Sequence, residues 1–264
     1  MRCLVVSDLH YALPQFDWLS SAAPQFDLVI FAGDALDIGS MVDPGAQILV
    51  VLKYLQRIAS TTKVIFCSGN HDLDFRSPEG EKVARWTEEV RQLGVVTDGD
   101  ALVVNDTLFT VCPWWDGPQM RERLIAQLAA DGRRRENLRW VWVHHAPPRA
   151  SQTSWAGKQS YGDADLVSWI EQYAPDIVIS GHIHQAPFVA EGSWADRLDK
   201  TWVFNAGRQY GAPPAYIVID TTIGEALWIS AMGAQSVRLD APLERPIARL
   251  RALPDWFEPP PPPP

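Results

Sequence analysis

The stretch KVIFCSGNHD, Lys63–Asp72, is an apolar run that ends on a glycine and three polar residues. Lys63–Cys67 is short and rich in β-branched and aromatic side chains, which predicts a buried strand. Gly69 allows a sharp turn after it, and few packing needs call for Asn-His-Asp at such a place. Because ligands of open α/β sheets gather beyond the carboxyl ends of the strands, the stretch indicates an α/β fold with a site at this edge.

The same arrangement of an apolar run followed by polar residues recurs along the chain. Taken singly, a D-x-H is usually a capping aspartate, a G-D a turn, and an H-x-H a surface pair. Together the motifs account for all six histidines, so a purely structural interpretation is disfavoured. The further motifs are SDLH (Ser7–His10), GDALD (Gly33–Asp37), VHHAPP (Val143–Pro148) and GHIH (Gly181–His184).

The residue types in these motifs are those that bind metal ions. D-x-H and H-x-H place two side chains on one side of an extended segment. Carboxylate, imidazole and amide oxygen together suit a divalent transition metal. The set is too large for one tetrahedral zinc and fits two ions that share a bridging carboxylate. The candidate ligands are Asp8, His10, Asp34, Asn70, His144, His182 and His184.

The N-terminal part of the chain alternates between strand and helix patterns. Strands are predicted at Cys3–Val6, Leu28–Ala32 and Lys63–Cys67, and helices at Gln47–Ala59 and Glu79–Leu93, the latter starting after Ser77-Pro78. This alternation favours parallel pairing with right-handed crossovers.

The later part is richer in strands. A hairpin is predicted around Asn105-Asp106, which favours partly antiparallel pairing. We therefore expect a core of two mixed sheets with helices outside. The hairpin strands are Ala101–Val104 and Thr107–Cys112; helices are expected at Met120–Ala130 and Asp163–Tyr173, and strands at Arg139–Val143, Asp176–Ser180, Trp202–Asn205, Ala215–Asp220 and Ala226–Ile229.

The chain length of 264 residues suits one sizeable domain, which we place at residues 1–235. Residues 236–258 are expected to form an extension that packs on the domain or trails from it. Residues 259–264 are all proline, which predicts an extended, disordered tail. The alternative for this tail is a ligand for an aromatic groove.

Composition narrows the class of protein. The net charge of −9 disfavours nucleic acid as a partner, without removing it. The apolar runs are too short to cross a bilayer, and the N-terminal MRCLVVSDLH reads as a first strand rather than a signal peptide. The three cysteines lack CxxC spacing, which indicates packed thiols in a reducing compartment and a cytoplasmic protein.

In this order, D-x-H, G-D, G-N-H-D, H and G-H-x-H, the motifs from Asp8 to His184 resemble those of the calcineurin-like binuclear metallophosphoesterase superfamily. They span about two-thirds of the chain. The resemblance implies a four-layer α/β/β/α sandwich with two mixed β-sheets and the site at the strand ends. It also implies a metal-dependent hydrolase of phosphoric esters.

The resemblance further assigns roles to single residues. His71 would lie beside the phosphate, and Asp72 would hold its far nitrogen. Two divalent ions are implied, with Mn, Fe and Zn the leading candidates. The first would be held by Asp8, His10, Asp34 and His184, and the second by Asp34, Asn70, His144 and His182.

The implied reaction is attack on phosphorus by a hydroxide that bridges the two ions. His71, if protonated, would stabilise the developing charge or protonate the leaving group. One stretch departs from the family. Many relatives have Asn-Pro-Gly-Ser after the last motif, whereas this chain has Asn205-Ala206-Gly207-Arg208. Arg208 is a candidate phosphate contact, with a surface ion pair as its alternative.

Loops are expected to contact the substrate and to determine its specificity. Trp155 and Tyr161 follow the His144 strand in a long polar segment, and the stretch CPWWDGP, Cys112–Pro118, offers a second wall. These aromatic side chains suit a nucleobase, with packing under a loop as the alternative. We therefore expect hydrolysis of phosphodiesters, nucleotide-like or cyclic. The rivals are a phosphomonoesterase, a DNA or RNA nuclease, and a metal-binding module without catalysis.

The adjacent histidines of VHHAPP raise a question of register. Alternation along the strand puts His144 on the face of Trp140 and Trp142, and His145 on the face of the valines between them. Only one of the two can point at a given ion. The resemblance assigns His144, which leaves His145 for a hydrogen bond to loop backbone or to a neighbouring acid.

Overall fold

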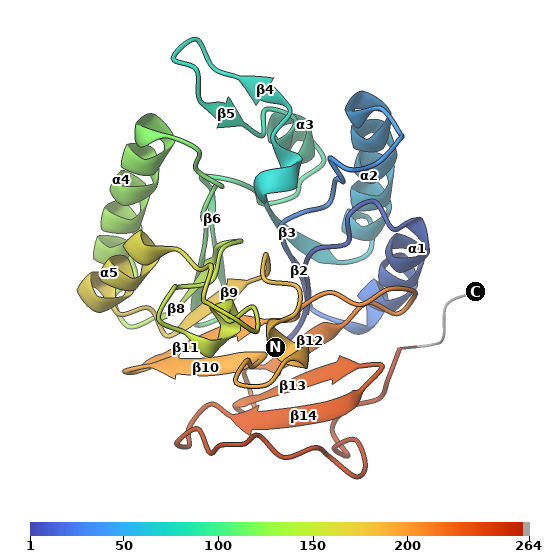
Figure 1. The fold of residues 1–264 in the computed structure, drawn as a ribbon, viewed down its shortest axis with the longest axis vertical. Helices are drawn as coiled ribbons and strands as arrows, with labels where there is room; N and C mark the ends of the chain where they lie inside the picture. The colour runs from blue at the N-terminus through green and yellow to red at the C-terminus, as the bar shows by residue number, and fades with distance from the viewer. Residues whose placement is uncertain (261–264) are drawn as a thin grey trace.

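Two six-stranded β-sheets face each other at the centre of the computed structural model, which describes residues 1–260 (Figure 1). The first sheet has the order β14-β13-β12-β1-β2-β3, in which β1, β2 and β3 run parallel and β12 to β14 antiparallel. Its strands are β1 (Arg2–Val6), β2 (Leu28–Ala32), β3 (Lys63–Cys67), β12 (Tyr216–Asp220), β13 (Glu225–Ser230) and β14 (Gly233–Arg238).

The second sheet has the order β10-β11-β9-β8-β7-β6. Its four central strands are parallel, and both edge strands are antiparallel to their neighbours. The strands are β6 (Ala101–Val104), β7 (Thr107–Val111), β8 (Arg139–Val143), β9 (Ile177–Ser180), β10 (Ala195–Leu198) and β11 (Thr201–Asn205). A separate small hairpin pairs β4 (Phe75–Arg76) with β5 (Lys82–Val83).

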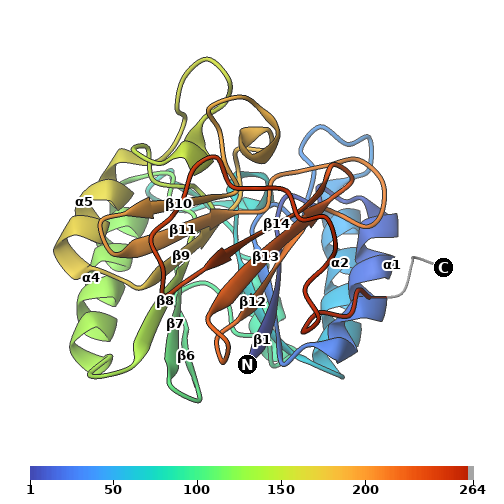
Figure 2. The same ribbon diagram turned by 90° about the horizontal axis from the view of Figure 1, so that it is seen from below.

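Helices cover the outer face of each sheet, so the expected α/β/β/α sandwich with two mixed sheets is confirmed (Figure 2). Against the first sheet lie α1 (Leu13–Ala22), α2 (Pro44–Ala59) and α3 (Thr87–Gln92). Against the second lie α4 (Pro118–Arg134) and α5 (Ala164–Tyr173). Short 3-10 turns are η1 (Ala23–Gln25), η2 (Asn70–Asp72), η3 (Gln152–Ser154) and η4 (Ala186–Phe188).

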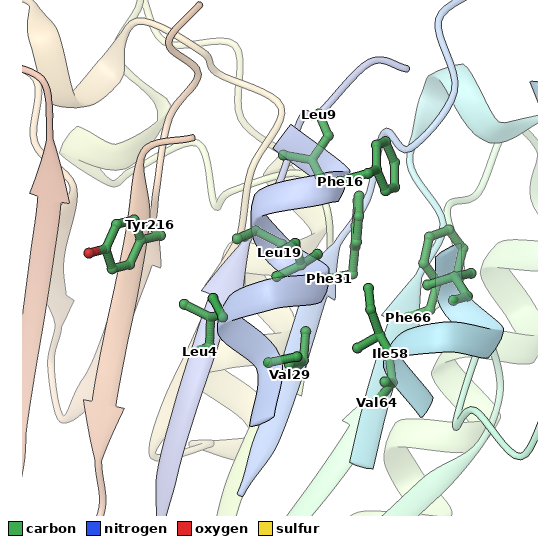
Figure 3. Packing of buried hydrophobic residues seen from close by; sticks show 14 of the residues in the cluster. Leu4, Leu9, Phe16, Leu19, Val29, Phe31, Ile58, Val64, Phe66 and Tyr216 are labelled. Atoms are coloured by element: carbon green, nitrogen blue, oxygen red, sulfur yellow. The ribbon is translucent and has the colours of Figure 1, made fainter. Parts of the chain in front are cut away.

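The apolar side chains form three buried layers, one between the sheets and one under each set of helices. Figure 3 shows the layer under α1 and α2, where Leu4 and Val29 of the sheet lie beneath Leu19 of α1. Alternation along β8 divides its side chains between two layers. Trp140 and Trp142 pack under α4 and α5, whereas the valines between them pack between the sheets.

Several segments differ from the predicted elements, and the strands β4, β5, β10 and β14 were not predicted. The helix expected at Glu79–Leu93 begins only at Thr87, because Gly80, with φ 94°, closes a turn in which its amide donates to Ser77 O. Helix α1 was not predicted. Its buried face carries Gln15, whose side-chain amide donates to the carbonyls of Gln209 and Gly211, so the apolar pattern is broken.

The C-terminal extension packs on the domain. The break expected after residue 235 lies inside β14, and Leu250 N donates to Ala234 O beside that strand. Phe257 is buried in the layer under α1 and α2, and Trp256 Nε1 donates to Glu225. Residues 261–264 of the expected poly-proline tail lie outside the described residues.

The three cysteines are buried free thiols in apolar layers, as expected for packed side chains. Among residues 1–260, the helices fall short of the length and hydropathy that a bilayer crossing requires.

Candidate metal centre

The loop after β1 holds Asp8 and His10 in left-handed backbone conformations, with φ values of 56° and 43°. Asp8 N donates to Gly33 O at 2.9 Å, and His10 N donates to Asp34 O at 3.0 Å, so this loop is fastened to the loop after β2. Such backbone costs about 1–3 kcal/mol per residue and persists only where its surroundings impose it. The expected extended geometry of this segment is wrong: β1 ends at Val6, and a turn brings the two side chains together.

Four expected ligands of one ion meet in a first ligand group, which consists of Asp8, His10, Asp34 and His184. His10 Nε2 lies 3.0 Å from His184 Nε2 and 3.6 Å from Asp34 Oδ2. His184 Nε2 lies 3.2 Å from Asp8 Oδ1. His184 is 34% exposed and the other three side chains are buried, so the group opens toward solvent on the His184 side.

A second ligand group consists of Asp34, His145 and His182. His145 Nδ1 lies 2.7 Å from Ala32 O, and since a carbonyl only accepts, Nδ1 carries the proton of the neutral ring. His145 Nε2 then presents a lone pair 3.1 Å from Asp34 Oδ2, without a hydrogen bond. Two acceptors at this distance require a proton or a cation between them.

The structure does not bring His144 to this group, and His145 stands in the place expected for it. His144 Nδ1 lies 2.9 Å from Ala146 O, and its Nε2 lies 3.9 Å from Asp163 Oδ2. His144 is 1% exposed but faces a different part of the molecule from Asp34.

The reason for this correction is the direction of the two faces of β8. The valine face lies between the two sheets, and the loops after β1 and β2 meet His145 on that side. His145 continues the valine face, whereas His144 continues the Trp140 and Trp142 face that is covered by α4 and α5.

Asn70 begins the turn η2 directly after β3. Its Oδ1 is buried and has no hydrogen-bond partner among residues 1–260. His71 N donates to Asp34 Oδ1 at 2.8 Å, which fixes this turn beside the carboxylate shared by both ligand groups. A buried amide oxygen without a partner is costly unless something else binds it, and a divalent cation would satisfy it.

Asp72 does not hold His71, contrary to the role expected for it. Its Oδ2 accepts hydrogen bonds from Asp34 N and Gly69 N, both at 2.8 Å, and its Oδ1 accepts one from Leu36 N at 3.0 Å. The buried carboxylate thus ties the loop after β2 to the loop after β3. It positions the backbone that carries Asp34.

His71 lies beside the first ligand group, with its ring centroid 4.4 Å from that of His10. Ile38 N donates to His71 Nδ1 at 3.2 Å. The carboxylate nearest to Nδ1 is Asp37, at 3.7 Å. Because Nδ1 accepts, neutral His71 carries its proton on Nε2 and is a donor there.

The protein's own charges set the protonation of these imidazoles. Burial lowers the pKa of His10 to about 4, although Asp34 and Asp8 oppose this. Burial and the charge of His145 lower the pKa of His182 to about 4. For His145, burial also disfavours the charge, but Asp34 and Asp8 outweigh it and raise the pKa to about 9.

Two carboxyl groups are perturbed in opposite directions. The pKa of Asp8 stays below its usual value in spite of burial, because His184 donates to it and His145 is near. Burial and the neighbouring charge of Asp34 raise the pKa of Asp72 to about 7. Acids and imidazoles with perturbed pKa values in one cleft are typical of a functional site.

Glycines allow the close approaches in the site. A Cβ on Gly33, whose φ is 91°, would lie 2.2 Å from His145 Nδ1. A Cβ on Gly69 would lie 2.2 Å from Asp34 Oδ1, and one on Gly181 would lie 2.4 Å from Asp8 Oδ2. The glycine of each motif therefore leaves the space that a ligand side chain occupies.

The aromatic side chains expected to line a pocket separate into two groups. Tyr161 lines a cavity beside His182 together with Trp114 and Trp115 of the CPWWDGP stretch. Trp155 does not line this cavity; it is half-buried, and its Nε1 donates to Ala190 O at 3.0 Å. The expectation for Trp155 as a pocket wall is therefore corrected.

Arg208 is half-buried next to the first ligand group. Its amide donates to His184 O at 3.0 Å, and its positive charge contributes to the low pKa of His10. The guanidinium also lies 5.4 Å from the ring centroid of Tyr210. No carboxylate lies within ion-pair distance of it among residues 1–260, so the surface ion pair is not its role.

One neighbour of the second ligand group was not singled out from the sequence. The Trp114 ring lies 5.7 Å from the His145 ring and 5.2 Å from the His182 ring. Its amide donates to Ser68 Oγ at 3.0 Å. No local motif marks Trp114 apart from Trp115, and only the bend after β7 decides which of them faces the histidines.

Comparisons with known proteins bear on the family and the fold of this chain. Residues 1–186 match the family model described as calcineurin-like phosphoesterase. No curated protein sequence matches the chain.

Several solved structures share the fold at low sequence identity. The TT1561 protein of Thermus thermophilus superposes with a TM-score of 0.56 at 13% identity, over 90% of this chain and 98% of that one. The purple acid phosphatase PPD1 from yellow lupin (Lupinus luteus) seeds gives 0.56 at 14% identity, over 94% of this chain and 52% of that one. A dimetal phosphatase from Danio rerio gives 0.52 at 8% identity, over 91% and 99%.

Proposed function

Because the chain belongs to the calcineurin-like phosphoesterase family, we propose that it hydrolyses small phosphodiesters with two divalent metal ions held around Asp34. The family binds divalent metals and acts on phosphoric esters, so the chain is a metal-dependent hydrolase. The number of ions, their ligands and the preference for diesters are the parts we propose.

The observation that carries the proposal is the pair of ligand groups that share Asp34. We assign the first ion to Asp8, His10, Asp34 and His184. The second ion is assigned to Asp34, Asn70, His145 and His182. The donor chemistry fits, since carboxylates, imidazoles and one amide oxygen suit Mn, Fe or Zn ions.

The buried atoms support this assignment independently of the motifs. His145 Nε2 and Asn70 Oδ1 are both buried without a hydrogen-bond partner among residues 1–260. Left alone, a buried acceptor such as Asn70 Oδ1 costs about 1–3 kcal/mol, and binding of a cation would remove that cost. For His145, the cation would take the place of the proton that Asp34 and Asp8 otherwise stabilise on the ring.

Bound divalent ions supply Lewis acidity, which lowers the pKa of water and offsets charge on phosphoryl oxygens. The chain contributes the remaining chemistry. His71 Nε2 is a donor even in the neutral ring and lies on the first ion's side, where it donates to a phosphoryl oxygen or to the leaving group. Arg208 supplies a fixed positive charge on the same side.

The preference for a diester rests on the shape of the surroundings. The first ligand group is open at His184, and a cavity adjoins His182 of the second. A substrate with two ester substituents can place one at the open face of the first ligand group and the other in the cavity beside His182. A phosphomonoester would leave one of them unfilled, and the net charge of −9 disfavours a nuclease. A reducing, cytoplasmic setting stays a prediction from the three thiols.

The test is hydrolysis of bis(4-nitrophenyl) phosphate and 4-nitrophenyl phosphate by the purified chain with Mn²⁺, with metal content measured on the same sample. We expect two ions per chain and a kcat/KM for the diester at least about tenfold above that for the monoester, a difference of about 1.4 kcal/mol. A higher kcat/KM for the monoester would make the chain a phosphomonoesterase. Metal without hydrolysis of either would favour a binding module.

A further inference from the structure

A cavity of about 380 Å³ adjoins the second ligand group at His182, within the usual size range of small-molecule sites. It combines aromatic surfaces with a few polar side chains. Its walls include Trp114, Trp115, His144, Arg149, Tyr161 and Asp163.

His144 is the unexplained polar group of this cavity. Its Nδ1 lies 2.9 Å from Ala146 O, so the neutral ring carries its proton there and Nε2 is an acceptor. His144 is 1% exposed, and its Nε2 has no hydrogen-bond partner among residues 1–260. With Nδ1 turned to the backbone, the Nε2 edge faces Asp163, the next wall of the cavity.

Asp163 presents a second acceptor at the same place. Its Oδ1 caps helix α5 by accepting from Asp165 N and Leu166 N. Its Oδ2 accepts from Trp115 Nε1 at 3.2 Å and has capacity for another hydrogen bond. Oδ2 lies 3.9 Å from His144 Nε2, so the cavity holds two acceptors side by side.

We propose that this cavity binds one ester substituent of the substrate, and that His144 Nε2 and Asp163 Oδ2 select a substituent that carries a vicinal diol, as in a ribonucleoside. Two hydroxyls on neighbouring carbons can each donate to one acceptor of the pair. Paired acceptors repel an anion, so the phosphate itself does not bind here. The inference rests on the proposed function, which places the phosphoryl group at the ions next to His182.

The aromatic walls complete the match to a ribonucleoside. Tyr161 is 57% exposed, and the Trp114 ring reaches from the cavity to His182. Flat aromatic side chains stack on a base without requiring a particular sequence of donors and acceptors. The two acceptors would therefore select the sugar, whereas the aromatic walls would bind different bases with little discrimination.

The selectivity arises because an analogue without one hydroxyl leaves a buried acceptor without a partner. This costs about 1–3 kcal/mol, or roughly 5- to 150-fold in affinity. We expect the Mn²⁺-loaded protein to bind adenosine 5′-monophosphate at least about tenfold more tightly than 2′-deoxyadenosine 5′-monophosphate, measured by calorimetry.

Two variants test the pair, and the ratio between the two ligands is measured within each protein so that a general loss of affinity cancels. His144→Phe keeps a flat ring and removes the acceptor. Asp163→Asn keeps the helix cap through its oxygen and places the amide NH₂ where Oδ2 accepted. Both should bring the ratio to about one. Asp165→Asn is the matched control, because both oxygens of Asp165 are already taken by Arg121 at 2.8 Å.

A ratio near one in the wild-type protein would overturn the inference, and would mean that only a water molecule bridges the two acceptors. A ratio that persists in His144→Phe would also overturn it. Loss of a metal ion in His144→Phe would make His144 a ligand and contradict the assignment altogether. Since binding is measured without turnover, these outcomes are separate from a failure of phosphodiester hydrolysis in the test above.

Discussion

The two ligand groups that share Asp34 are built in different ways. The first takes Asp8 and His10 from a turn of left-handed backbone, and its member His184 is 34% exposed. The second takes His145 directly from the end of a regular strand and encloses it completely. The neighbouring loop enforces the left-handed backbone of Asp8 and His10, whereas His145, two residues after β8, continues the valine face of that strand. Only His145 is placed in this way, because His182 of the second group also has a left-handed backbone, with φ 66°. The first group is therefore the open side of the site and the second the enclosed side.

Asp34 belongs to both groups, so its replacement should have the largest effect. Asp34→Asn removes the charge that offsets two cations, and we expect loss of both ions and hydrolysis at the uncatalysed background. Mass spectrometry of the metals and the rate with bis(4-nitrophenyl) phosphate measure this. A variant that kept both ions would show that the groups do not share this carboxylate.

His71 lies on the open side and belongs to neither of the two groups that share Asp34, although it lies close enough to His10 and Asp37 to form a third cluster with them. His71→Gln should lower kcat by about 10²–10⁴-fold, the usual contribution of a positioned proton donor, while both ions stay bound. The measurement is kcat for the diester together with metal content. Loss of an ion in His71→Gln would show that His71 is a metal ligand and that the first ligand group has a fifth member.

Arg208 is the cation of the open side. Arg208→Ala removes a charged hydrogen bond to the phosphate, worth about 1.5–3 kcal/mol, so kcat/KM for the diester should fall about 10- to 150-fold. Arg57→Ala is a matched control, because Arg57 is exposed in the last turn of α2. An equal effect of the two variants would mean that only the overall positive charge matters.

A half-buried acid, Asp98, supports the loop behind the second ligand group. Ser68 N donates to Asp98 Oδ1 at 2.9 Å, and Ser68 Oγ accepts from Trp114 N. Burial raises the pKa of Asp98 to about 6, from 3.8. The folded state therefore favours the protonated form, and its stabilisation is fully present below pH 3.8 and lost as pH rises through 6.

Asp98→Asn cannot ionise and should escape this loss. Between pH 4 and 7.5 the wild-type free energy of unfolding should fall by up to about 3 kcal/mol more than that of the variant. Urea unfolding of both proteins at the two pH values, with chelator throughout, measures the difference. If the free energy of unfolding changed with pH in the same way in both proteins, the Asp98 carboxylate would be solvated in the folded state and its pKa would not be raised.

The difference between the two sides also explains what could be predicted from the sequence. Gly-Asp, Asn-His-Asp and His-x-His each contain their own turn residues, so Asp34, Asn70 and His182 could be found from local patterns. Strands with strong apolar runs, such as β2 and β3, were predicted with their observed bounds. These features depend only on residues next to each other.

Features that depend on distant packing could not be predicted in this way. The choice between His144 and His145 depends on which face of β8 is turned toward the other sheet. The two residues are adjacent, so the local sequence does not distinguish them. The role of Asp72 depends on a loop 36 residues away at Leu36, which its carboxylate binds. Helix α1 was missed because the polar residue Gln15 interrupts the apolar pattern of its buried face. The partner that satisfies the Gln15 side chain, Gln209, lies 194 residues further along the chain.

The central claim is that His145, rather than its neighbour, holds the second ion. The direct measurement is the metal content of His145→Ala and His144→Ala, each purified with Mn²⁺ and compared with the wild-type protein. We predict that His145→Ala retains one ion fewer per chain and loses most activity, because it removes the Nε2 that lies 3.1 Å from Asp34 Oδ2. His144→Ala should retain the full complement of ions. Full metal in His145→Ala together with loss of an ion in His144→Ala would contradict the account.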